Sequence, residues 1–167
     1  MTNFRPMRRI RQLLDNEEAK EILASCTHGV LAVSGDNGYP YAVPMSYAFA
    51  DGSLYFHSAT EGHKVDALRS NAKASFSVVE RDEIRPAEYT TYFRSAIAFG
   101  RVSIIEGDDE KMAALQLLGE RYRPGHSADA HDEAAKSLNH VLILRFDIEH
   151  LTGKQAIELV NKTQRDK

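Results

Sequence analysis

The chain has 167 residues, 43% of them hydrophobic, and a formal net charge of −3. This length and composition suit one domain with a sizeable core, so we expect residues 1–167 to form a single domain. The small net charge gives no general attraction to nucleic acid or acidic membranes, and no uncharged apolar run is long enough to span a bilayer. The one cysteine, Cys26, excludes an internal disulfide and fits a reducing, cytoplasmic compartment.

The first segment, residues 1–12, is a basic arm with arginines at positions 5, 8, 9 and 11. Because the chain as a whole is acidic, we expect this arm to be solvated or to pair with a partner subunit, not to bind nucleic acid. A helix is predicted from Asp15 to Ser25, since Asp15 can cap it and Glu18 stands where a capping-box carboxylate belongs. Cys26 follows on the apolar face of this helix and is expected to be a buried, small apolar residue.

The next stretch predicts an antiparallel meander of three strands. Asp36-Asn37-Gly38 and Asp51-Gly52 separate the strands, and such Asn-Gly and Asp-Gly pairs supply the positive φ angles of tight hairpin turns. Pro44 cannot donate to a strand ladder, so it marks an edge, a bulge or a break within the second strand. The predicted strands are His28–Ser34, Tyr39–Ala50 and Leu54–Ala59.

The remaining chain predicts more strands with peripheral helices. Alternation within Thr90–Glu106, one long strand or a bent pair, puts Ile97 and Phe99 on one side and Ala96 and Ala98 on the other. The whole pattern is β-rich α+β, and a closed or nearly closed barrel would remove the exposed edges of such a sheet. The other predicted segments are a helix Gly62–Ser70, a strand Lys73–Glu80, a charged loop Arg81–Glu88, a helix capped by Asp108 or Asp109, a loop Arg123–His131, a short helix Asp132–Leu138, a strand Val141–Ile148 and a charged tail over residues 158–167.

The segment from Phe56 to Lys64 is the first candidate binding site. A strand ends there and a helix begins at Gly62, so unpaired N–H groups and a positive dipole end are available to a phosphate. Lys64 and His63 can add positive charge, and Ser58 offers a hydroxyl. The alternative is an ordinary strand-to-helix turn with an exposed lysine, and the residue types leave both readings open.

Two further patterns are weaker. A break at Pro44 would free backbone groups for a planar heterocycle with an amide edge, although a plain edge strand explains the same residues. His57 ends an apolar strand and can point into a cleft, although such a histidine is more often structural. The polar residues of the loop near His126 match no familiar zinc motif, so we expect no metal site.

Five segments in their order resemble the pyridoxamine 5'-phosphate oxidase-like flavin-binding split barrels, and within that group the Nim-type nitroimidazole-resistance proteins. The similarity runs from about Arg9 to Ile157, nearly the whole chain. The segments are Gly29–Val33, Asn37–Pro44, Leu54–Ala59 followed by Glu61–Lys64, Phe93–Gly100 and Leu151–Lys154. This resemblance implies an antiparallel split β-barrel with peripheral helices, and a homodimer with two FMN sites at the subunit interface.

The resemblance also assigns residues to the cofactor, which would be FMN with FAD as an alternative. The strand around Pro44 would face the isoalloxazine ring, His57 would lie beside the ring, and His63 and Lys64 would meet the phosphate. A histidine at position 63, where relatives often have arginine, makes that contact dependent on pH. The implied cofactor-binding residues are Ala42, Val43, Pro44, Met45, His57, Ser58, Ala59, Gly62, His63, Lys64 and Ser95.

The implied activity is that of an FMN-dependent reductase. Reduced flavin would pass electrons to a small, electron-poor acceptor such as a nitroaromatic, and His57 would be the catalytic residue that donates a proton or orients the acceptor. The residues with which true oxidases hold pyridoxamine phosphate have no counterpart here, which argues against vitamin B6 oxidation. The alternative is a flavin-binding or flavin-sensing module without turnover.

Overall fold

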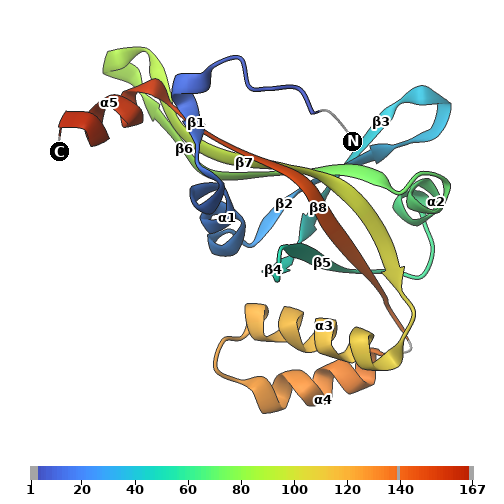
Figure 1. Ribbon diagram of the computed structural model, residues 1–167. Helices are drawn as coiled ribbons and strands as arrows, with labels where there is room; N and C mark the ends of the chain where they lie inside the picture. Colours follow the sequence, from blue (N-terminus) through green and yellow to red (C-terminus); the bar gives the residue numbers. More distant parts are fainter. Residues whose placement is uncertain (1–3, 139, 166–167) are drawn as a thin grey trace.

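The computed structural model describes residues 4–138 and 140–165, which form an antiparallel sheet of eight strands with helices around it (Figure 1). The strand order is β3-β2-β6-β7-β8-β5-β4, and β1 pairs with β8. The strands are β1 (Leu13–Leu14), β2 (His28–Ser34), β3 (Pro40–Ser46), β4 (Ala48–Ala50), β5 (Ser53–Ser58), β6 (Lys73–Arg85), β7 (Thr90–Ile105) and β8 (Leu142–Gln155). The α-helices are α1 (Asn16–Ser25), α2 (His63–Ser70), α3 (Asp108–Tyr122), α4 (Ser127–Ser137) and α5 (Ile157–Arg165).

Tyr47 connects the two end strands of this sheet, which curls into a split barrel. The two end strands, β3 and β4, are consecutive in the chain and Tyr47 alone separates them, so the sheet must curl until its two ends meet. Tyr47 is 1% exposed, and its hydroxyl donates a 2.6 Å hydrogen bond to the carbonyl of Leu23 in α1. Burial raises the pKa of this phenol, which therefore remains a donor. The split barrel expected from the resemblance is confirmed.

The predicted three-strand meander is wrong at its middle strand. The strand expected over Tyr39–Ala50 breaks at Tyr47 into β3 and β4, which lie at opposite ends of the sheet. Pro44 falls in β3, an end strand, where its missing N–H is tolerated. At the break Tyr47 contacts Leu23, 24 residues earlier in the chain, so no local sequence pattern reveals the contact.

Two apolar cores lie on the two faces of the curled sheet. Inside the barrel, the ring of Phe76 packs edge-on against Tyr47 and Phe56, with ring centroids 5.0 and 5.2 Å apart, and α1 contributes to the same cluster. The second core packs Leu118 of α3 with Ile143 of β8. In Figure 1, α3 and α4 lie together beneath the sheet, so this helical hairpin covers the outer side of β5 and β8.

The charged segment Arg81–Glu88 is not the loop that its composition predicts. It continues β6 as far as Arg85 and pairs with the first residues of β7, after a register shift at Glu80. Glu83 bonds Arg81 and lies 2.7 Å from the guanidinium of Arg85, so the charges neutralise one another along the strand. Strand pairing with β7 thus keeps Arg81–Arg85 extended, although their low hydrophobicity alone would predict a loop.

The connection from β7 to α4 also differs from expectation. Gly107 occupies the N-cap of α3, and the two acidic residues expected to cap it, Asp108 and Asp109, lie in the first turn near the positive end of the helix dipole. The loop expected over Arg123–His131 is shorter, because α4 already begins at Ser127.

The C-terminal strand and tail are more ordered than predicted. β8 does not end at Ile148 but continues to Gln155, because its last residues pair with β7, Ala98 with Leu151 for example. The expected charged tail over residues 158–167 lies largely in α5. Residues 166–167 of this tail and residues 1–3 of the basic arm lie outside the described residues.

Candidate functional site

The split of the barrel lies between the edges of β3 and β5. β4 pairs with β5 so that Ala48 faces Tyr55, and the same register continued would place Ser46 opposite His57 and Pro44 opposite Ala59. β3, which precedes Tyr47 in the chain, does not continue this pairing with β5 and pairs with β2 instead. The expected ring-binding residues Ala42–Met45 and His57–Ala59 therefore lie on the two strands that border the split, and unpaired backbone groups face it from both sides.

The start of α2 offers donors to an anion. Gly62 has φ +125°, and a β-carbon there would meet nothing within 4 Å, so the backbone requires glycine while the space outside stays open. The first helical hydrogen bond is donated by Val65, so the amides of His63 and Lys64 point out of the helix end. Lys64 is half-buried and forms no ion pair with any residue that the structure describes. Two free amides and an ammonium group fit a phosphate.

His63 is held by the β2–β3 hairpin. Its ring stacks on Tyr41 of β3, with centroids 4.2 Å apart and planes 14° apart, and its Nε2 lies 3.6 Å from the carboxylate of Asp36. These contacts bring the start of α2 against β3, next to the split. They also give His63 a partner of its own, Asp36, within the chain.

His57 and Ser58 project to opposite faces of β5. Ser58 is 4% exposed and its hydroxyl donates to the carbonyl of Ala59 at 3.0 Å, so this hydroxyl is satisfied locally. His57 is exposed on the outer face, where its ring lies 6.3 Å from that of Tyr122 in α3. Of these two neighbours, His57 therefore has the side chain that is available to a ligand.

Ser95 is not brought to the split of its own chain. It lies in β7 and pairs with Val79 of β6 and Lys154 of β8, and β2 and β6 stand between β7 and β3. Ser95 therefore lies on neither of the strands that border the split.

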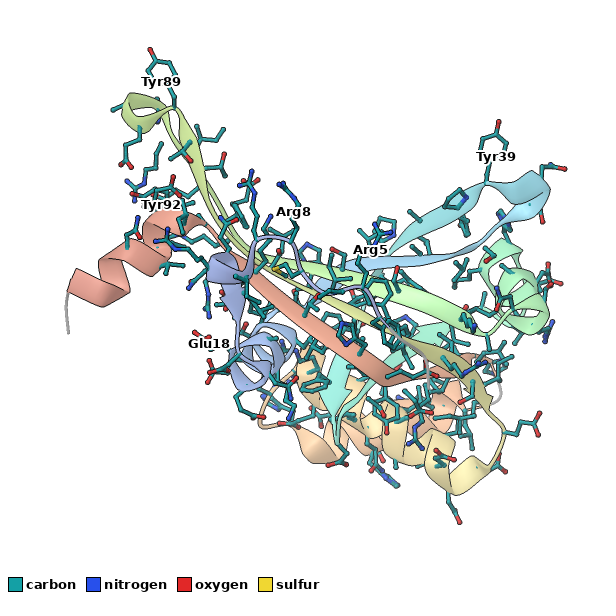
Figure 2. All side chains as sticks on the ribbon, turned by 45° about the horizontal axis from the view of Figure 1, so that its top comes forward. Arg5, Arg8, Glu18, Tyr39, Tyr89 and Tyr92 are labelled. Atoms are coloured by element: carbon teal, nitrogen blue, oxygen red, sulfur yellow. The ribbon has the colours of Figure 1, made fainter. Side chains whose placement is uncertain are left out.

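The outer face of β2, β6 and β7 is apolar, which the sequence reasoning did not single out. Val30, Ile97 and Phe99 are each about two-fifths exposed, and Val30 and Ile97 flank Ser77 in one row. The alternation that puts Ile97 and Phe99 on one side was the available signal. Figure 2 shows the arm with Arg5 and Arg8 passing between two projecting hairpins, whose tips carry the exposed Tyr39 and Tyr89.

The described residues hold no group of three or more acidic, His or Cys side chains arranged for a metal ion. In the loop that the sequence singled out, His126 lies 3.6 Å from Asp129, while His131 contacts Gln116. Among the described helices, none combines the length and the apolar character that crossing a membrane requires.

Comparison with known proteins identifies a family and a relative whose sequences are similar to this chain. The profile of the pyridoxamine 5'-phosphate oxidase family matches residues 15–155. An uncharacterised protein of Rhizobium meliloti (strain 1021) is 26% identical over 152 residues, which cover 87% of this chain and 95% of that protein.

Three solved structures have a similar fold. A candidate 5-nitroimidazole antibiotic resistance protein from Bacteroides thetaiotaomicron VPI-5482 is 22% identical, with a TM-score of 0.72 and 86% of each chain covered. A FAD-binding protein from Mesorhizobium loti is 25% identical, with a TM-score of 0.65 and coverage of 87% of this chain and 97% of that one. A FAD and heme binding protein from Mycobacterium smegmatis is 27% identical, with a TM-score of 0.75 and coverage of 87% and 73%.

Proposed function

The chain belongs to the pyridoxamine 5'-phosphate oxidase family, and we propose that it is a flavoprotein that binds FMN at the split and reduces a small, electron-poor acceptor such as a nitroaromatic. The observation that carries the proposal is the joint position of the split and the start of α2. Unpaired strand edges there adjoin a helix end with free amides and Lys64, which has no ion-pair partner among the described residues. Two of the similar solved structures are of FAD-binding proteins, which supports a flavin as the ligand.

In this proposal, different residues bind different parts of the cofactor. Backbone groups of β3 around Pro44 pair with the amide edge of the ring, while Lys64 and the amides at the start of α2 receive the phosphate. Flavin bound there would supply the redox chemistry. His57 is exposed on the outer face of β5, where an acceptor could reach its ring, and its proposed role is to donate a proton or orient the acceptor.

Titration with FMN tests this function. We expect quenching of flavin fluorescence and measurable binding heat at micromolar concentrations, because the split and the helix end are already formed. Mass analysis of the flavin released on denaturation then separates FMN from FAD. A folded protein that neither quenches FMN nor produces binding heat would contradict the proposal.

The Lys64→Ala variant should lose FMN affinity and keep its affinity for riboflavin. A charge-assisted bond to phosphate contributes about 1.5–3 kcal/mol, or roughly a tenfold to hundredfold loss of affinity. Lys20→Ala, in α1, is the matched control because Lys20 pairs with Glu17 on that helix. Equal losses of FMN and riboflavin affinity in Lys64→Ala would assign Lys64 to another part of the ligand or to the fold.

We also propose that the protein is a homodimer joined through the apolar outer face around Ile97 and Phe99. An exposed apolar sheet face of this kind is typical of an interface. The same arrangement would let Ser95 of one subunit approach the cofactor of the other. Light scattering should therefore give twice the mass of the chain at micromolar concentration.

A charge placed on this face tests the assignment. Ile97→Glu should shift the protein toward the monomer, because a buried carboxylate without a partner is costly. Ala113→Glu introduces the same charge on an exposed position of α3 and should leave the dimer intact. A wild-type protein that is monomeric at micromolar concentration would remove the shared-site arrangement.

A further inference from the structure

A separate pocket of about 180 Å³ lies between β5 and the α3–α4 hairpin. Buried apolar side chains line its interior: Leu115, Leu118 and Ala134. Groups with polar atoms line it as well: His57, Tyr122 and Glu133. Because apolar and polar surfaces meet here, the pocket suits a molecule with an apolar body and one polar end.

The size of the pocket selects a single ring. An apolar cavity of about 150 Å³ accommodates a molecule of the size of benzene. The present volume is slightly larger, so it accepts one substituted aromatic ring and excludes a fused three-ring system. The pocket is therefore not a second flavin site.

The charges around the pocket favour a neutral ligand. No lysine or arginine lines it, so an anion would find no counter-charge. Glu133 lies 3.2 Å from Lys136 of the same helix, so its carboxylate has a cationic partner. His57 and Tyr122 can each donate or accept a hydrogen bond, and both suit a nitro, hydroxyl or carbonyl substituent.

The walls of the pocket are held in place from outside. Arg121 of α3 donates to the carbonyls of Ser25 and Cys26 at the end of α1, at 3.0 and 2.6 Å. α3 also packs on β5 and on α4. The pocket is thus preformed, which lowers the entropic cost of binding.

We propose that this pocket is the acceptor subsite, and that it binds a neutral single-ring aromatic molecule with its polar substituent at His57. His57 links the pocket to the split, since it lines the pocket and lies on β5 beyond Tyr55, the last residue of β5 that pairs with β4 toward the split. The identification of the ligand as an electron acceptor rests on the proposed function. The binding of a single aromatic ring in the pocket is independent of that function.

The test measures nitrobenzene binding by methyl NMR, with and without FMN. We expect saturable shifts of the Leu115 and Leu118 methyl groups, and no saturable shifts with 9-nitroanthracene, whose three fused rings exceed the volume. Ala134→Met should weaken nitrobenzene binding about tenfold, because the longer side chain occupies the pocket. Ala135→Met alters the exposed neighbour on α4 and should leave the affinity unchanged.

Unshifted methyl groups at millimolar nitrobenzene, or equal binding of one-ring and three-ring probes, would overturn the subsite. The comparison of the two probes uses the wild-type protein, so it decides the matter even if Ala134→Met does not fold. Ring binding without any FMN binding would support the pocket and contradict the proposed reductase. FMN binding without ring binding would support the flavoprotein and place the acceptor elsewhere.

Discussion

Replacing His57 with alanine should slow the oxidation of the reduced, flavin-loaded protein by a nitroaromatic about 10²–10⁴-fold, the usual contribution of a general acid. His57 is exposed on the outer face of β5, at the start of the split and in the wall of the proposed acceptor pocket. An imidazole at this position can give a proton to an acceptor as it takes up electrons. Stopped-flow absorbance measures the rate directly.

The same variant should bind FMN within about twofold of the wild-type affinity, since the phosphate and the ring edge are assigned to other residues. His126→Ala, an exposed histidine in the α3–α4 loop, is the matched control and should leave both quantities unchanged. If His57→Ala loosens FMN and leaves turnover per bound flavin unchanged, His57 holds the flavin and is not the proton donor.

The Gly100→Ala variant should lose about 3 kcal/mol or more of its free energy of unfolding, because the added methyl group has no room. A β-carbon at Gly100 would lie 2.0 Å from the carbonyl oxygen of Asp147 and 2.9 Å from the ring of Phe146. Asp147 belongs to β8, and its backbone is held by the ladder with β7 beside a register shift at Phe99 and Gly100. The backbone therefore cannot yield without breaking the pairing of the two longest strands.

Urea denaturation followed by circular dichroism measures this loss. Gly107→Ala is the control, since a β-carbon there meets nothing within 4 Å and φ is an ordinary −72°. Its cost should stay below about 1 kcal/mol, the scale of a weakened helix cap. Similar small losses in both variants would mean that the sheet relaxes around Gly100.

Several elements of this fold could be predicted because their causes are local. Asp15 and Glu18 form the capping box of α1, with bonds of 2.8 and 3.0 Å between residues three apart. The Asp36-Asn37-Gly38 turn has positive φ at Asn37 and Gly38, as its residue types require. Strand β2 has the predicted bounds, His28–Ser34.

The candidate site could be predicted only in part. The sequence order and the resemblance drew attention to the strand with Pro44, to His57 and to Lys64. Their assignment to a cofactor stays a prediction. The fold puts Pro44 and His57 on the two strands that border the split, and the contact of His63 with Tyr41 puts the start of α2 against β3. The stacking of His63 on Tyr41 and the approach of His57 to Tyr122 join elements that no local pattern relates.

The sequence by itself determined the segments whose hydrogen bonds close over three or four residues, and the alternation that separates the buried Ala96 and Ala98 from the exposed Ile97 and Phe99. Only the tertiary structure decided where the sheet parts. At that place Tyr47 is bonded to Leu23 of α1, and β3 pairs with β2 and not with β5. Such choices compare whole packed arrangements, so burial and long-range pairing decide them and local propensity does not.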